Sequence, residues 1–191
     1  MDDAAVGGRT IDRLEWIAAC TYRVEFPAGS GIRERVLMPT APSERNGMED
    51  VRMVRFDGAD EEPAYLGTYT AFDGRTVASS LVSTSDFRTF DMAPLNGPGS
   101  KDKGMALFPR RVGGRYLALS RADRESNGVS MSDDLRHWNA PVQVQAPDRP
   151  WDTRILLTYE GLADPRGPRV DAPRESLFWR DGTIRIGGRE A

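Results

Sequence analysis

The stretch YLGTYTAFDGRTVASSLVS, residues 65–83, decides the fold class of this chain. Residues 65–71 and 76–83 are both rich in β-branched, aromatic and small side chains, which favour strands. Between these two runs, Asp73-Gly74 is a dipeptide typical of a tight turn between antiparallel strands. The stretch therefore predicts a β-hairpin, and it suggests a chain built from short strands.

The same order of signals returns about fifty residues later. Residues 106–112 and 116–121 are strand-like, and Gly113-Gly114 marks a turn between them. Tyr116-Leu117 lies 51 residues after Tyr65-Leu66, and each pair follows a turn. The chain therefore contains two similar hairpins in succession.

Two polar corners, residues 85–90 and 132–138, also look alike. Asp86 and Asp134 occupy the same place in each corner and lie 48 residues apart. A repeat near fifty residues, made of short strands without a convincing amphipathic helix, is typical of propeller blades. A β-sandwich with two hairpins that resemble each other by chance is the alternative interpretation.

The predicted fold is therefore all-β, an incomplete propeller of about two to three blades. Residues 1–150 are expected to form this partial propeller, and residues 151–191 a divergent or irregular tail, loop-like at 164–169. Further strands are predicted at residues 13–26, 53–56, 129–131, 155–159 and 176–179, and near Phe90.

Composition excludes several classes of function. The 26 basic and 29 acidic residues are interspersed, which argues against a nucleic-acid partner. The apolar runs are too short to span a membrane, and the first residues lack the pattern of a secretory signal, so we expect a cytoplasmic protein. Cys20 and His137 are the single cysteine and histidine, so we expect neither a disulfide within the chain nor a metal site.

Four segments together resemble glycoside hydrolase family 130, the β-mannoside phosphorylases and β-mannosidases. The segment NGMEDVR at residues 46–52 is similar to the family's E-D-x-R segment. The hairpin strand at 68–74, the segment KGMALFPRR at 103–111 and the corner at 132–138 also match in order. The resemblance covers roughly residues 22–152, and one departure is Val51, where most familiar members have proline.

The resemblance implies a five-bladed propeller that cleaves β-mannosidic bonds with inversion, using phosphate or water as the nucleophile. It assigns Asp50 as the catalytic acid, Lys103 to phosphate, and Arg52 and Arg121 to substrate. The expected partner is a β-linked mannoside oligosaccharide, and inorganic phosphate is a co-substrate rather than a cofactor. No other cofactor is expected.

General chemistry agrees with one protein carboxyl group at such a site. An inverting enzyme needs a proton donor on the side of the leaving group and a nucleophile on the opposite face. Phosphate is itself a nucleophile, so a single carboxyl suffices when cationic side chains hold the dianion. If the strand is regular, Arg52 shares a face with Asp50 and can contact its carboxylate or the sugar.

Each assigned residue also has a purely structural interpretation. Asp50 is in a glycine-containing corner where aspartates commonly serve the turn, and Arg52 can pair with Glu49 at the surface. Lys103 follows other charged residues in a loop, where a solvated side chain is usual. Aromatic residues on the strands are expected to pack inside the sheets.

The resemblance ends at both sides of residues 22–152. The family has a further blade upstream, and downstream it has a strand that ends in a His-Gly pair, for which this chain has only Tyr159-Glu160-Gly161. We expect truncation, a shifted reading frame or divergence as the cause. The alternative function is thus a non-catalytic remnant or a sugar-binding piece; a five-bladed furanosidase would need three separated acids, of which we place only Asp50.

Overall fold

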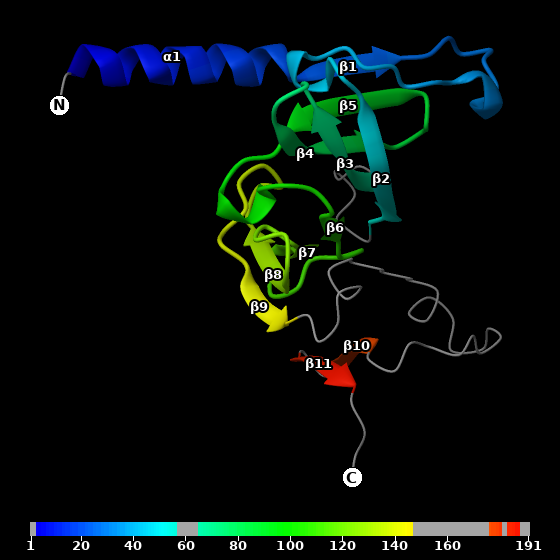
Figure 1. Ribbon diagram of the computed structural model, residues 1–191. Coiled ribbons are helices and arrows are strands. Elements are labelled where there is room, and N and C mark those ends of the chain that lie inside the picture. Colours follow the sequence, from blue (N-terminus) through cyan, green and yellow to red (C-terminus); the bar gives the residue numbers. More distant parts are fainter. Residues whose placement is uncertain (1–2, 57–64, 147–175, 181–182, 188–191) are drawn as a thin grey trace. The chain divides into compact units, whose positions relative to one another are not determined.

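A computed structural model describes residues 3–56, 65–146, 176–180 and 183–187 (Figure 1). The chain separates into two compact units, Met1–Ile155 and Leu156–Ala191. In the second unit, β10 (Ser176–Arg180) and β11 (Thr183–Gly187) pair as an antiparallel hairpin, which confirms the strand predicted at 176–179. The strand predicted at 155–159 lies outside the described residues.

The first sheet contains five antiparallel strands in the order β1-β5-β4-β3-β2. The strands are β1 (Tyr22–Glu25), β2 (Met48–Arg55), β3 (Tyr65–Phe72), β4 (Val77–Thr84) and β5 (Thr89–Pro94). The predicted hairpin is β3–β4, where Asp73 Oδ1 accepts hydrogen bonds from the backbone N–H groups of Thr76 and Arg75 at 2.6 and 2.7 Å. These two bonds stabilise the carboxylate and hold the Asp73 pKa below its usual value.

The second sheet contains four antiparallel strands in the order β6-β7-β8-β9. The strands are β6 (Ala106–Leu107), β7 (Tyr116–Ser120), β8 (Asn127–Ser132) and β9 (Val142–Gln145). Gly113 and Gly114 make the predicted turn, with φ angles of 59° and 80° that glycine adopts without strain. The strand predicted over 106–112 is wrong in its length. Phe108 N–H still donates to Leu117 O, but Pro109 has no N–H with which to continue the ladder.

The two polar corners share one hydrogen-bonding pattern at positions 48 residues apart. In each corner an aspartate oxygen accepts two backbone N–H groups, each at 2.8 Å. The donors are Arg88 and Thr89 to Asp86, and Arg136 and His137 to Asp134. The residue after each aspartate is left-handed, with φ of 54° at Phe87 and 64° at Leu135. The predicted internal repeat is therefore a repeat of structure.

Strands β2–β5 and β6–β9 follow one another in the same order, which confirms two successive antiparallel sheets between residues 50 and 145. In the described part of that span, the helical structure is limited to one turn, η3 (Pro98–Ser100). Strand β1 is an addition to the first sheet that the sequence repeat does not predict. The described residues are thus mostly antiparallel β-sheet, which agrees with the predicted all-β class. The number of blades and their arrangement as a propeller stay predictions.

The two sheets pack against each other through one apolar core. Its buried members are Phe56, Leu66, Leu81, Leu95, Met105, Leu107, Tyr116, Ala118 and Trp138. Trp138 is fully buried beside the segment that crosses from β5 to β6. The backbone N–H of Trp138 donates to Asn96 O, and the backbone N–H of Asn96 donates to Arg136 O, both at 2.9 Å. A Cβ atom on Gly99 would lie 2.2 Å from Asn139 O, so this close approach requires glycine.

A helix, α1 (Asp3–Ala19), corrects the strand predicted over residues 13–26, of which only β1 is extended. Ile11, Leu14 and Ala18 recur at intervals of three and four, which is helical spacing, and a short apolar run alone does not separate helix from strand. The helix ends where Thr21 N–H donates to Ala18 O at 3.1 Å. Within the described ranges, no helix combines the length and the apolar character that crossing a membrane requires.

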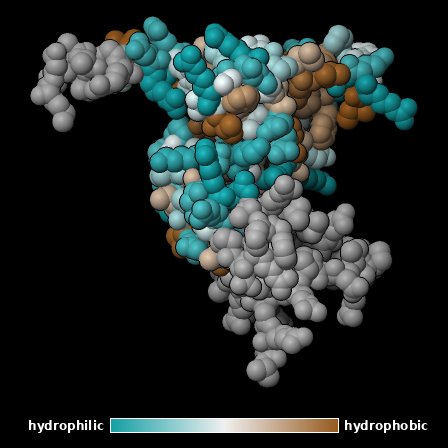
Figure 2. Space-filling model, viewed as in Figure 1, coloured by the Kyte–Doolittle hydropathy of each residue, from teal (hydrophilic) through white to brown (hydrophobic). Residues whose placement is uncertain are grey.

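The other face of the first sheet is covered by a second apolar cluster. Buried Tyr69, Ala71, Val82, Phe90 and Met92 contact side chains that include Phe26 and Leu37, from the segment between β1 and β2. This segment contains two short helical turns, η1 (Ile32–Glu34) and η2 (Pro42–Glu44). Figure 2 shows brown atoms where Figure 1 draws this segment, in keeping with the exposed side chains of Ile32, Val36 and Met38.

Glu44 is a fully buried carboxylate at the end of η2. Its oxygens accept hydrogen bonds from Tyr69 Oη at 2.6 Å, from Tyr22 Oη at 3.0 Å, and from the backbone N–H groups of Thr40 and Ala41 at 2.8 and 3.0 Å. Burial, with the hydrogen bond and the charge of Glu44, raises the Tyr69 pKa above its ordinary value, and burial and Glu44 raise the Tyr22 pKa. Glu44 thus joins β1, β3 and the segment that leads into β2.

Replacement of Trp138 by alanine should lower the free energy of unfolding by about 3–5 kcal/mol, because it leaves a cavity between the two sheets. Urea unfolding followed by far-UV circular dichroism measures the change. Val142→Ala is the matched control, since Val142 is 65% exposed and should cost little. A loss below about 1 kcal/mol for Trp138→Ala would contradict packing of the two sheets on this residue.

Tyr69→Phe should reveal the Glu44 network through its pH dependence. The folded-state pKa of Tyr69 lies above the unfolded value near 10, so its contribution to stability is complete below pH 10 and is lost as the pH rises above 10. The difference in unfolding free energy between parent and variant should therefore be constant from pH 7 to 9. It should narrow above pH 10, by up to about 1.4 kcal/mol per pH unit.

Urea unfolding at each pH supplies these differences. Tyr65→Phe is the control, since it removes a hydroxyl from the same strand and Tyr65 makes none of the Glu44 hydrogen bonds described above. A difference between parent and Tyr69→Phe that is unchanged up to pH 11 would show that the Tyr69 hydroxyl does not bond to Glu44 in solution.

Candidate functional site

A β-bulge in β2 places Asp50. Glu49 pairs with Thr70 and Arg52 pairs with Thr68, so two residues of β2 stand opposite one residue of β3. Asp50 takes a φ of 56°, a left-handed conformation that aspartate tolerates better than most residues. The strand is therefore not regular at this point, so the expectation that Asp50 and Arg52 share a face does not apply. The exposed Asp50 side chain makes no hydrogen bond or ion pair within residues 3–56 and 65–146.

Glu49 joins the bulge to the loop that precedes β6. Its Oε1 lies 3.0 Å from Lys103 Nζ, in an ion pair whose side chains are 56% and 41% exposed. A pair this exposed adds little to stability. It does bring the segment 46–52 and the segment 103–111 together, although they come from different sheets.

Arg52 lies against the same loop. Its Nη1 atom is buried and has no hydrogen-bond partner among the described residues. A Cβ atom on Gly104 would come within 3.3 Å of this nitrogen, so the guanidinium group contacts the backbone next to Lys103. The alternative prediction, a surface ion pair between Arg52 and Glu49, is wrong. Glu49 pairs with Lys103 instead. A buried guanidinium nitrogen without a partner is a donor available to a ligand.

Arg121 follows the last residue of β7 and is half-buried. Because Leu119 pairs with Ala106, residue 121 lies at the end of the second sheet where β6 begins, close in register to Gly104. The structure therefore brings Glu49, Arg52 and Lys103 together, and it places Arg121 at the same end of the second sheet as Lys103. Within the described ranges, no hydrogen bond or ion pair joins Asp50 to any of the other three predicted residues.

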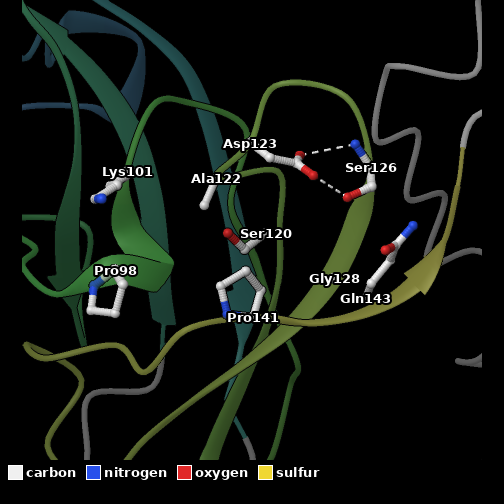
Figure 3. A pocket seen from close by; sticks show the side chains of 9 residues that line it. All are labelled: Pro98, Lys101, Ser120, Ala122, Asp123, Ser126, Gly128, Pro141 and Gln143. Atoms are coloured by element: carbon white, nitrogen blue, oxygen red, sulfur yellow. Dashed lines mark hydrogen bonds between the residues drawn. The ribbon is translucent and has the colours of Figure 1, made fainter.

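Next to Arg121, the ends of β7 and β8 border a cavity of about 340 Å³ (Figure 3). Asp123 bonds to the backbone N–H of Ser126 at 2.9 Å and to its hydroxyl, and these bonds hold the Asp123 pKa below its usual value. A second cavity, of about 560 Å³, lies beside the β3–β4 hairpin. Asp50, Arg52 and Lys103 do not line either of these two cavities, so a cavity shared by these three residues stays a prediction.

Sequence reasoning did not identify Glu44 as a residue that supports the candidate site. Its backbone O accepts the Gly47 N–H at 2.8 Å, and Phe72 N–H donates to Gly47 O at 3.0 Å. Glu44 therefore fixes the turn from which Glu49 and Asp50 extend. Its only sequence signal is a carboxylate two positions before Asn46-Gly47, and acidic residues at such positions are ordinarily exposed.

No known family profile matches the chain. Over 84 residues, 38% of the chain, it is 29% identical to a beta-1,4-mannooligosaccharide phosphorylase of Ruminococcus albus, of which it covers 23%. Over 96 residues, 47% of the chain, it is 30% identical to a beta-1,2-mannobiose phosphorylase of Listeria innocua, of which it covers 25%.

Among solved structures, the beta-1,2-mannobiose phosphorylase of Listeria innocua in complex with beta-1,2-mannobiose matches with a TM-score of 0.47 and 24% identity. The match covers 59% of this chain and 31% of that chain. The chain spans about a quarter of the length of the curated relatives it matches. Over less than half of its length, it is thus weakly similar in sequence to two mannoside phosphorylases.

Proposed function

We infer that this chain is a partial member of glycoside hydrolase family 130, of the inverting β-mannoside phosphorylase or β-mannosidase type. One observation carries the proposal. The Glu49–Lys103 ion pair joins the two segments on which the resemblance chiefly rests. The two residues are 54 positions apart, Glu49 on β2 and Lys103 in the loop that precedes β6. Similarity to two mannoside phosphorylases supports the same substrate class, a β-linked mannoside.

In this proposal, Asp50 donates the proton. Its exposed carboxyl group stands on a bulge, and a bulge commonly turns a side chain out of the regular ladder toward a site. The bond between the anomeric carbon and the glycosidic oxygen breaks, and the proton passes to that oxygen as the sugar leaves. A phosphate oxygen forms the new bond to the anomeric carbon from the opposite face, which gives mannose 1-phosphate with inversion. With water as the nucleophile, the product is mannose.

The cationic residues supply binding in this scheme. Arg52 Nη1, which has no hydrogen-bond partner in the part of the chain that the structure describes, is a donor for a sugar hydroxyl or a phosphate oxygen, and Lys103 is the phosphate ligand that the resemblance assigns. Arg121, at the same end of the second sheet, is the further substrate ligand. Glu49 positions the Lys103 ammonium group, and its negative charge offsets part of the attraction of Lys103 for phosphate.

The same ion pair favours a second function, that of a sugar-binding piece without catalysis. Phosphate must give up its hydration to bind, and it needs several charge-assisted hydrogen bonds in return. Lys103 is the one phosphate ligand assigned by resemblance, and in the structure it is half-exposed and already paired. Binding of a neutral sugar does not require this charge.

The 191-residue chain should therefore show little or no phosphorolysis of β-mannobiose. An exposed ion-paired lysine contributes on the order of 1 kcal/mol, which is too little to hold phosphate at millimolar concentration. Product analysis of β-1,2- and β-1,4-mannobiose, with and without phosphate, measures mannose 1-phosphate and mannose. Robust, phosphate-dependent formation of mannose 1-phosphate would contradict this expectation and would favour the catalytic function for the chain alone.

A chimeric enzyme can test whether the proposed site residues of this chain support catalysis when the rest of a complete phosphorylase surrounds them. Residues 46–121 of this chain would replace the matching segment of the beta-1,2-mannobiose phosphorylase of Listeria innocua. The graft should release mannose 1-phosphate, and Asp50→Asn in the graft should lower kcat by about 10²–10⁴-fold, because only the proton donor is lost. Affinity for mannobiose, measured by calorimetry, should change little.

Asp91→Asn is the matched control in the graft, since it removes an exposed carboxylate from β5. Its kcat should stay close to that of the unmodified graft. A graft that turns over mannobiose equally well with Asn at position 50 would overturn the role proposed for Asp50.

A further inference from the structure

The cavity of about 560 Å³ has no part in the proposed reaction. It is bordered by Arg13 and Trp16 of α1, by the β3–β4 hairpin with Asp73 and Thr76, and by the crossing segment, including Asn96, Lys101 and Asp102. Its volume is within the range of small-molecule sites. Because Met48 pairs with Ala71, this hairpin is at the end of the first sheet where β2 begins, which is also the end that carries Asp50.

The charges that line the cavity cancel. Among the lining side chains, Arg13 and Lys101 are positive and Asp73 and Asp102 are negative; Asp102 Oδ2 also pairs at 3.0 Å with Arg124 Nε, which is outside the lining. A cavity selective for a polyanion or for a metal ion would carry an excess of one sign. The lining therefore favours a neutral ligand that both donates and accepts hydrogen bonds.

The polar groups of the lining retain hydrogen-bonding capacity. Asp73 Oδ1 is held by backbone N–H groups, and its other oxygen remains an acceptor, because a carboxylate has about four acceptor sites. Asn96 Oδ1 lies 2.7 Å from His137 Nδ1, and the Asn96 amide nitrogen is a donor not used in that contact. Lys101 is exposed and makes no ion pair within the described ranges. The lining thus offers both donors and acceptors, and ring hydroxyls use both.

Trp16 gives the cavity an aromatic wall. The Arg13 guanidinium carbon lies 4.4 Å from the centre of the indole ring, so this cation packs on the ring. Indole combines a broad apolar surface with one N–H donor, which suits a ligand that has both C–H and hydroxyl surfaces. Val77 and Ala78 add a smaller apolar contribution.

We propose that this cavity is a second carbohydrate site that binds a neutral saccharide of one or two units. Its occupant lies beside Lys101 and Asp102, in the same loop as Lys103. The saccharide class follows from the lining alone. The choice of a mannoside as that saccharide rests on the proposed function.

The test is calorimetric titration of the complete 191-residue chain with β-1,4-mannobiose. Trp16→Ala should weaken binding at least about tenfold, which corresponds to about 1.4 kcal/mol, and Trp16→Phe should restore most of the loss. Gln143→Ala is the matched control, because Gln143 lines the cavity of Figure 3 and not the proposed saccharide cavity. It should leave the affinity unchanged.

Two further arms separate this proposal from the proposed function. Asp50→Asn should leave the Trp16-dependent binding intact. If the parent chain binds mannobiose in a Trp16-dependent way but shows no phosphorolysis, the cavity proposal is supported and only catalysis by this chain is contradicted. Sodium phosphate titrated in place of mannobiose should give no Trp16-dependent heat. Absence of binding of both mannobiose and cellobiose, or mannobiose binding that is equal in the parent and Trp16→Ala, would overturn the cavity proposal, as would tighter binding of phosphate than of sugar. Cellobiose binding with the same Trp16 dependence would support a saccharide site and count against its mannoside identity.

Discussion

Each of the two sheets must bury its apolar faces, and packing of one sheet on the other is the constraint on which the described fold depends. Leu66 and Leu81 from the first sheet meet Leu107 and Tyr116 from the second, and Trp138 completes this core. A four-stranded sheet has too little apolar surface of its own to be stable alone, so neighbouring sheets must cover each other. The close fit at Gly99 follows from the same constraint, because the chain must cross between the sheets without holding them apart.

Sheet packing also explains where the candidate site is found. The crossing segment and the start of β2 come together at one end of the sheets, where polar side chains face away from the core. Thr68 on β3 donates to Met105 O at 2.7 Å, and Ser79 on β4 donates to Asp102 O at 2.8 Å. These bonds fix the loop that carries Lys103 to the first sheet. The core therefore supplies rigidity, and the rim supplies charged groups from two distant parts of the sequence.

Much of the fold could be predicted because its signals are local. Asp73-Gly74 and Gly113-Gly114 specify turns by their own backbone preferences, and each corner aspartate bonds to N–H groups two and three residues away. The helix α1 was missed because a short run of apolar residues suits either helix or strand. Strand β6 was predicted too long because the effect of Pro109 on the ladder depends on the pairing partner.

Less of the candidate site could be predicted. Resemblance selected Asp50, Arg52, Lys103 and Arg121, but the bulge at Asp50 and the contact of Glu49 with Lys103 depend on strand register and on sheet packing. Burial of Glu44 depends on Tyr22 and Tyr69, which lie 22 and 25 residues from it in sequence. The Glu44–Tyr22–Tyr69 trio also constrains how the sequence can change during evolution. Loss of either hydroxyl, or of the carboxylate, leaves the others buried with unmet hydrogen bonds, so the three residues should be inherited together and should vary together among relatives.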